Sequence, residues 1–187
     1  MKQAVIDIGS NSIRLTLYEV SAQGFKILFR EKHMAGLAGY VDHGALSPDG
    51  IARACDALLD FSQTLELLGI REAAVFATAS LRNIENPEQA LCEIRAATGF
   101  DVQILSGEEE ALLGYAGAMY DLDLTDGAFV DIGGASTEVV TFEGRQVLDS
   151  VSFPVGSLSL YRRCVKKILP GPGSLRRIES VLDAELD

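Results

Sequence analysis

The sequence lacks the features that mark several large classes of protein. Its three cysteines, Cys55, Cys92 and Cys164, are widely spaced and form no CxxC pair, so neither a disulfide framework nor a zinc site is supported. The longest apolar runs, such as residues 73–77, are far too short to cross a bilayer. The N-terminus does not resemble a signal peptide, because one lysine precedes a strand-like segment. We therefore expect a reduced, cytoplasmic protein with no membrane partner.

Three common catalytic motifs are also missing. There is no GxxxxGK[ST] sequence, no GxGxxG after a strand, and no GxSxG nucleophile elbow. The two histidines, His33 and His43, are not spaced like metal ligands on a helix. The chain is therefore not a P-loop NTPase, and any phosphate chemistry must rest on other residues.

Basic residues are scarce, which limits the expected partners. Sixteen basic residues against 27 acidic ones give a net charge of −11, which argues against nucleic-acid binding and against anionic membranes. Six of the basic residues nevertheless fall close together: Arg162, Arg163, Lys166, Lys167, Arg176 and Arg177. This window is either a solvated helix face or a local patch for a polyanion.

What the sequence does contain is a mixture of strand and helix signals over 187 residues, 48% of them apolar, which predicts an α/β protein. Strands are expected at 3–8, 13–20, 25–30, 73–77, 102–105, 128–132, 137–142 and 147–152. Helices are expected from Pro48 to Gly69, at 87–97, from Ser106 to Tyr120, at 156–169, and from Ser174 onward. We expect residues 34–47 to be irregular and exposed.

An internal repeat is the strongest organising signal. Residues 4–12, AVIDIGSNS, match residues 128–136, AFVDIGGAS, at an offset of 124. Each copy reads as an apolar strand that ends in aspartate, a small polar turn with glycine, and two further strands. We expect two similar domains, residues 1–123 and 124–187, each contributing one turn to a shared cleft. Clefts of this kind commonly bind ligands.

The two turns contain the groups that bind phosphate and Mg²⁺. Glycine-rich turns let backbone N–H groups approach a phosphate, and an aspartate at the strand end can hold Mg²⁺ directly or through water. The candidate metal ligands are Asp7 and Asp131. The candidate phosphate-binding residues are Gly9, Ser10, Asn11, Ser12, Gly133, Gly134, Ala135 and Ser136. Either turn alone also fits an ordinary β-hairpin, and the matched pair favours the ligand-binding interpretation.

Two further residues are candidates for catalysis. Ser106 and Glu109 form a predicted capping box, which leaves Glu110 in the first turn of a helix without a capping role. A carboxylate there could orient and deprotonate a water that attacks a phosphoryl group. Arg82 follows a strand and could clamp phosphate with its two-pronged guanidinium. The alternative for both residues is an ordinary solvated surface position.

Together these segments resemble the exopolyphosphatase / guanosine pentaphosphate phosphohydrolase family. Four ordered motifs carry the resemblance: 7–15 (DIGSNSIRL), 78–82 (TASLR), 106–111 (SGEEEA) and 130–138 (VDIGGASTE). The resemblance implies the duplicated ribonuclease H-like fold of actin, sugar kinases and heat-shock chaperone ATPases. It also implies Mg²⁺-dependent hydrolysis of terminal phosphoanhydride bonds in polyphosphate or guanosine pentaphosphate.

Carried over by motif, Glu110 would be the base that activates water, and Arg82 would bind the phosphate being removed. Asp131 would hold Mg²⁺ or the water, with Asp7 assisting. Family members continue further, so we expect an incomplete second domain here, part of a longer protein that could form a homodimer.

Ala135 stands where the family usually has glycine. This difference and the short second domain keep open a non-catalytic module that binds polyphosphate or an alarmone. A third alternative, a nucleotide-hydrolysing or kinase member of the same superfamily, is disfavoured by Glu110 and Arg82.

Overall fold

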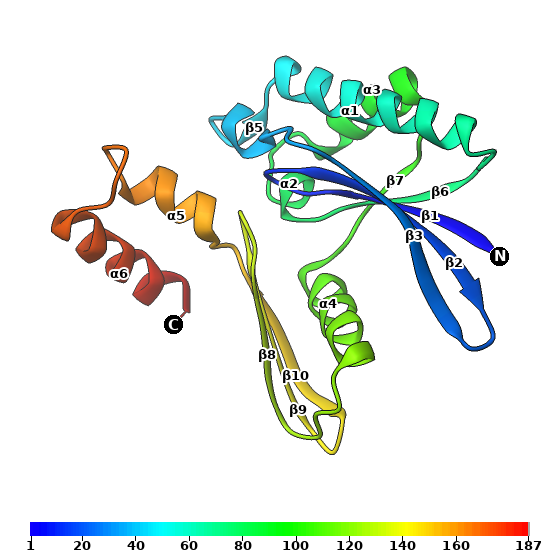
Figure 1. Ribbon diagram of the computed structural model, residues 1–187. Helices are drawn as coiled ribbons and strands as arrows, with labels where there is room; N and C mark the ends of the chain where they lie inside the picture. Colours follow the sequence, from blue (N-terminus) through cyan, green and yellow to red (C-terminus); the bar gives the residue numbers. More distant parts are fainter. Residues whose placement is uncertain (187) are drawn as a thin grey trace. The chain divides into compact units, whose positions relative to one another are not determined.

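The computed structural model describes residues 1–186, which form two compact units (Figure 1). Unit 1 comprises Met1–Ile104, and unit 2 begins at Leu105. Each unit is built on its own sheet, as the internal repeat predicts.

The sheet of unit 1 has five strands in the order β3-β2-β1-β6-β7. The strands are β1 (Lys2–Ile8), β2 (Ile13–Ser21), β3 (Gly24–His33), β6 (Ala73–Ala77) and β7 (Val102–Ile104). Strand β2 runs antiparallel to its neighbours β1 and β3, whereas β1, β6 and β7 run parallel to one another. The carboxyl ends of β1 and β6 therefore meet at one edge of the sheet, and this edge carries the candidate residues of unit 1.

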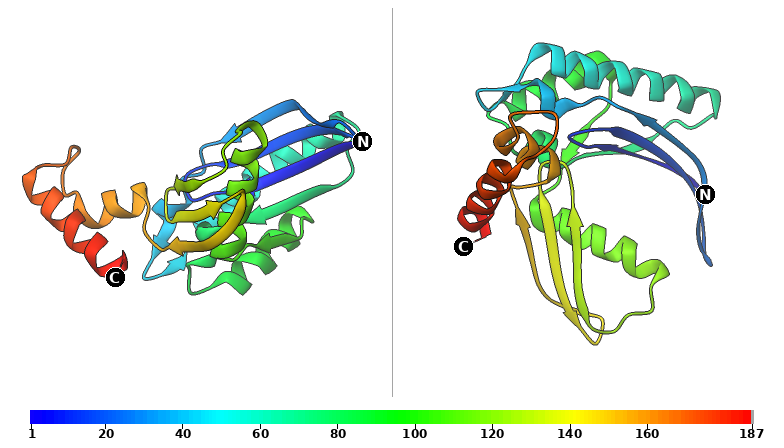
Figure 2. Two further views of the ribbon diagram at one scale, coloured as in Figure 1. Left: turned by 90° about the horizontal axis from the view of Figure 1, so that it is seen from below. Right: turned by 60° about the vertical axis from the view of Figure 1, so that its left-hand side comes forward.

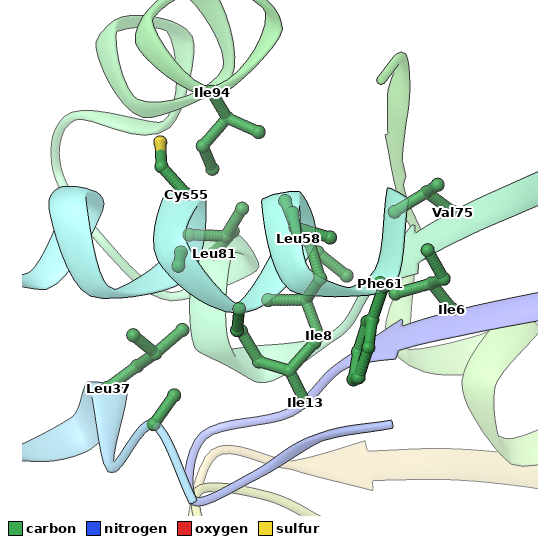
Figure 3. Close-up of a cluster of buried hydrophobic side chains, with 14 of the residues drawn as sticks. Ile6, Ile8, Ile13, Leu37, Cys55, Leu58, Phe61, Val75, Leu81 and Ile94 are labelled. Carbon is green, nitrogen blue, oxygen red and sulfur yellow. The ribbon is translucent and has the colours of Figure 1, made fainter. Parts of the chain in front are cut away.

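Helices α1 (Pro48–Leu67) and α3 (Pro87–Thr98) pack against each other in the core of unit 1, and α2 (Ala79–Arg82) is a single turn after β6. The start of α1 is set by local chemistry: the Ser47 hydroxyl accepts a hydrogen bond from the Gly50 N–H, with Pro48 at the first position. The core between α1 and the sheet includes Leu58 and Phe61 (Figure 3). Burying a side chain of this size contributes about 1.5–3 kcal/mol.

The expectation that residues 34–47 are irregular and exposed is wrong. This segment forms η1 (Leu37–Tyr40) and a small hairpin of β4 (Val41–Asp42) and β5 (Ala45–Leu46), and Leu37 and Leu46 are buried. The Asn86 side chain holds the hairpin in place: its Oδ1 accepts from the Leu46 N–H at 2.8 Å, and its Nδ2 donates to the Leu46 carbonyl at 3.1 Å. A side chain 40 residues away thus satisfies the backbone of this segment.

Unit 2 is built on a three-stranded antiparallel sheet in the order β10-β9-β8 (Figure 2). Its elements are α4 (Gly107–Asp121), β8 (Gly127–Ile132), β9 (Thr137–Glu143), β10 (Gln146–Phe153), α5 (Ser157–Cys164) and α6 (Pro172–Leu186). Gly144 and Arg145, both with positive φ, form the two-residue turn between β9 and β10. No helix among residues 1–186 is both long and apolar enough to span a membrane.

Helix α5 is shorter than predicted, and α6 starts earlier. The guanidinium of Arg177 donates two hydrogen bonds, of 2.8 and 2.6 Å, to the carbonyl of Cys164 and so caps the end of α5. Pro172, rather than Ser174, opens α6, because proline suits the first position of a helix.

Helix α4 groups with unit 2, although the sequence places the domain boundary after residue 123. The Tyr115 ring packs against Phe129 and Phe142 of the sheet, with centroids 6.4 and 5.0 Å away. Ala111 and Val140 complete this small core. The aromatic contacts therefore join α4 to the strands that follow it, and the compact units divide at residue 104 instead.

The internal repeat extends to strand register. Asp7 lies opposite Arg14 in unit 1, and Asp131 lies opposite Glu138 in unit 2, which is the same pairing at the offset of 124. The covered faces differ, however. Ile6 and Ile8 are fully buried beneath α1, whereas their counterparts, Val130 and Ile132, are 53% and 66% exposed because α4 covers the opposite face.

Candidate functional site

The first glycine-rich turn, residues 9–12, joins β1 to β2. The Gly9 N–H donates to the Ser12 carbonyl at 3.1 Å, and this bond closes the turn. A Cβ at Gly9 would lie only 2.9 Å from the same oxygen, so the closure requires glycine. Ser10 and Ser12 are buried, and Asn11 is exposed.

The second turn, residues 133–136, joins β8 to β9 with the same closure. The Gly133 N–H donates to the Ser136 carbonyl at 2.9 Å. Ala135 fits this turn without strain, because the only non-glycine residues with positive φ among residues 1–186 are His43 and Arg145. The backbone therefore does not require a third glycine at this position.

In each turn, a backbone N–H from a later segment of the chain donates to the carbonyl of the second turn residue. The Ala38 N–H donates to the Ser10 carbonyl at 2.9 Å, and the Leu158 N–H donates to the Gly134 carbonyl at 2.9 Å. Within residues 1–186, no protein acceptor binds the following N–H groups: Ser10, Asn11 and Ser12 in the first turn, and Gly134, Ala135 and Ser136 in the second. Consecutive N–H groups of this kind form a concave site that suits an anion.

Asp7 and Arg82 lie at the same edge of unit 1 as the first turn. Ile8 at the end of β1 is in register with Ala77 at the end of β6, and the Ser80 hydroxyl donates to the Ile8 carbonyl. This bond ties the short helix α2, which ends at the half-buried Arg82, to the start of the turn. Unit 1 therefore brings together all its predicted site residues.

The carboxylate of Asp7 is accessible from a groove of about 510 Å³ on the open face of the unit 1 sheet. The groove also contains Arg14, whose Nε lies 3.7 Å from the Asp7 carboxylate, and Arg30 and Lys32 on β3. The three cations of this groove exceed its two carboxylates, Asp7 and Glu31, so the groove as a whole favours an anion.

The capping box at the start of α4 forms as predicted. The Glu109 N–H donates to the Ser106 hydroxyl at 3.1 Å, and the Ser106 N–H donates to the Glu109 carboxylate at 2.8 Å. Glu110 follows, half-buried, with its own N–H on the Ser106 carbonyl. A Cβ at Gly107 would lie 2.4 Å from the Ser152 Cβ, so this first turn lies directly against β10.

Glu138 is an acidic residue that the motif analysis left out of the site. It pairs across the sheet with Asp131 on one side and Ser152 on the other, and the Ser152 hydroxyl donates to its carboxylate at 2.8 Å. Its exposed fraction is only 2%. The sequence could have indicated this burial, because Glu138 stands two residues before the buried Val140 and so lies on the same, inward face of β9.

Unit 2 thus brings together the start of α4 with Glu110, the row of Asp131 and Glu138, and the second turn. No cluster of three metal-binding side chains occurs within residues 1–186, so the donors do not form an all-protein cage. Separate carboxylates fit Mg²⁺ nonetheless, because this ion keeps several waters and shares substrate phosphate oxygens.

Comparison with known proteins identifies the family. The family model described as the Ppx/GppA phosphatase family matches residues 16–187. The chain belongs to the Ppx/GppA phosphatase family. The sequence resemblance is thereby confirmed.

Solved structures of this family match the whole chain. An exopolyphosphatase from Cytophaga hutchinsonii superposes with a TM-score of 0.90 at 23% identity, over 100% of this chain and 61% of that one. A Ppx/GppA family member from Aquifex aeolicus has a TM-score of 0.77 at 28% identity, again over 100% and 61%. An exopolyphosphatase-like protein gives 0.89 at 27% identity, over 100% and 60%.

These likenesses confirm that this Ppx/GppA protein has the α/β fold of the Cytophaga and Aquifex structures. The chain spans about 61% of the length of the Cytophaga and Aquifex structures.

The capping box of α4 gives a prediction for pH. Hydrogen bonds from the Ser106 backbone N–H and then its side chain hold the pKa of Glu109 below its ordinary value of 4.5. A carboxyl whose folded pKa is depressed stabilises the fold above its unfolded pKa, and this contribution is lost as pH falls through the folded value. We expect the isosteric Glu109→Gln variant to be less stable than the wild type at neutral pH.

The stability difference between Glu109→Gln and the wild type should shrink as the pH is lowered from neutral through the folded pKa of Glu109, which lies below 4.5. Thermal unfolding over a series of pH values measures it. Glu108→Gln, which removes a charge from the same turn but not the bond to Ser106, is the matched control. A difference that stays constant with pH would contradict the prediction.

Proposed function

We propose that this protein hydrolyses terminal phosphoanhydride bonds of inorganic polyphosphate, guanosine pentaphosphate or both, with Glu110 activating the attacking water. The observation that carries the proposal is the duplicated turn: two segments at the same register, each with three consecutive N–H groups that bind nothing within the described residues. Family membership supports the same substrate class.

In the proposed reaction, the turn N–H groups bind phosphate oxygens and Arg82 binds the phosphate that is removed. The forked guanidinium makes two parallel, charge-assisted hydrogen bonds to a phosphoryl group. The Arg14, Arg30 and Lys32 side chains of the unit 1 groove attract the polyanion toward Asp7.

Glu110 accepts a proton from water as the water oxygen forms a bond to the terminal phosphorus. The bridging P–O bond breaks, and its electron pair leaves with the shortened phosphate chain. Asp7 and Asp131 are the residues that would hold Mg²⁺, which when bound offsets the negative charge of the phosphate oxygens.

A second candidate function is binding without turnover. Within residues 1–186, the sheet of unit 2 has three strands, whereas the sheet of unit 1 has five. The side chains of Val130 and Ile132 on the smaller sheet are exposed. A site carried by such a unit could bind polyphosphate or an alarmone without completing the chemistry.

Phosphate release distinguishes the two candidates. We expect the purified chain with Mg²⁺ to release phosphate from long-chain polyphosphate or guanosine pentaphosphate, and chelation of the metal to abolish release. The Aquifex aeolicus family member serves as the reference protein under the same conditions. Retained polyphosphate binding with no release by this chain would support the binding module, and release that survives chelation would contradict the metal requirement.

The C-terminal basic window bears on substrate preference. Arg163 pairs with Glu185 at 2.9 Å, and Arg177 caps α5, so both are engaged within unit 2. The remaining four members are exposed on or beside α5 and α6: Arg162, Lys166, Lys167 and Arg176. A long polyanion can reach more of these exposed cations than a nucleotide can, which favours polyphosphate.

A further inference from the structure

We infer that Ser157, at the start of α5, is a positioning residue that sets the direction of the N–H groups in the second turn. This inference rests on the proposed function, because it concerns how the same turn binds phosphate. Ser157 itself lies outside the four sequence motifs.

Several hydrogen bonds join the start of α5 to the second turn. Both the backbone N–H and the hydroxyl of Ser157 donate to the Gly133 carbonyl, at 2.9 and 3.0 Å. The N–H groups of Leu158 and Ser159 both donate to the Gly134 carbonyl, at 2.9 and 3.0 Å. Two consecutive carbonyls of the turn are therefore each held by two donors.

These contacts fix which way the turn faces. A peptide plane carries its carbonyl and its N–H on opposite sides, so anchoring a carbonyl on α5 directs the N–H of the next residue away from α5. Anchoring Gly133 and Gly134 thus directs the N–H groups of Gly134 and Ala135 to the side where an anion can bind. Pre-oriented N–H groups bind phosphate without a reorganisation cost.

Unit 1 contains a related arrangement, in which one donor holds each of two turn carbonyls, one position later in the repeat than in unit 2. The Gly36 and Ala38 N–H groups, beside and within η1, donate to the carbonyls of Asn11 and Ser10 at 2.8 and 2.9 Å. In each unit the supporting segment follows the third strand of the sheet. Gly36 and Ala38 donate only through their backbone, whereas Ser157 also donates through its side chain. A substitution can remove that side-chain donor without changing the backbone.

The test is a titration of the full chain with inorganic phosphate, followed by the amide NMR shifts of Gly134, Ala135 and Ser136. We expect Ser157→Ala to weaken phosphate binding about three- to tenfold, the effect of one neutral hydrogen bond. Ser157→Thr, which keeps the hydroxyl, should restore the affinity. With polyphosphate as substrate, KM should rise with kcat unchanged, since Ser157 does not touch the reacting atoms.

Ser159→Ala is the matched control. The Ser159 hydroxyl also lies at the start of α5, but it bonds to the N–H and the carbonyl of Gly156, at 2.8 and 2.9 Å, and not to the turn. We expect this variant to lower thermal stability like Ser157→Ala while keeping phosphate affinity within about twofold of the wild type.

The outcomes separate the inference from the proposed function. If Ser157→Ala binds phosphate as tightly as the wild type, or if Ser159→Ala loses as much affinity as Ser157→Ala, the inference alone is overturned. A wild-type protein whose turn amides do not respond to phosphate, and which releases none from either substrate, would overturn both.

Discussion

Replacing Glu110 by glutamine is expected to slow phosphate release by about 10²- to 10⁴-fold, the usual contribution of a positioned general base. Glutamine keeps the size and hydrogen-bonding shape of the side chain but cannot take a proton from water. Phosphate affinity should stay close to that of the wild type, because the turn N–H groups and Arg82 supply the binding contacts. Rates with polyphosphate and guanosine pentaphosphate, alongside phosphate titrations, measure both effects.

Glu108→Gln is the matched control for this prediction. Glu108 lies two residues earlier in the first turn of α4, is exposed, and carries the same charge. The control should retain most of the activity, since it leaves the proposed base in place. Full activity in Glu110→Gln, or an equal loss in both variants, would mean that Glu110 is not the base.

Replacing Gly156 by alanine should distort the second turn. The new Cβ would lie 2.7 Å from the Gly133 carbonyl oxygen and 2.8 Å from the Ala135 nitrogen, distances that real Cβ atoms do not show. Both neighbours are backbone atoms, so the turn itself must shift. The φ of −145° at Gly156 is extended backbone that alanine adopts freely, which makes the effect purely steric.

We expect Gly156→Ala to weaken phosphate binding about five- to a hundredfold, from the 1–3 kcal/mol that overpacking usually costs. Gly171→Ala is the control, because a Cβ there meets nothing within 4 Å. Isothermal titration with phosphate measures the affinities, and circular dichroism checks that each variant folds. Wild-type affinity in a folded Gly156→Ala protein would show that the second turn does not bind phosphate.

The strands and helix starts could be predicted because their causes are local. Ser47 and Pro48 open α1, and the Ser106–Glu109 capping box opens α4, through contacts within four residues. Alternation of apolar residues located β1 and β2, since every second side chain enters the core. The repeat at an offset of 124 predicted both turns.

The wrong expectations for residues 34–47 and for the end of α5 both involve contacts between residues far apart in the sequence. Residues 34–47 looked like an exposed loop because nothing nearby predicts that Asn86 would bind Leu46. The end of α5 depends in the same way on Arg177, 13 residues beyond Cys164. Partners at such distances are chosen by packing, which propensity and periodicity do not report.

The amino-acid sequence by itself determined the family, the duplicated strand–turn–strand units and the candidate residues within each turn, because these depend on residue type and short-range spacing. Only the tertiary structure decided that α4 packs on the second sheet through Tyr115, that Glu138 is buried beside Asp131, and that α5 holds the carbonyls of the second turn. The physical reason is that contacts between residues far apart in the sequence depend on packing, which residue type and short-range spacing do not report.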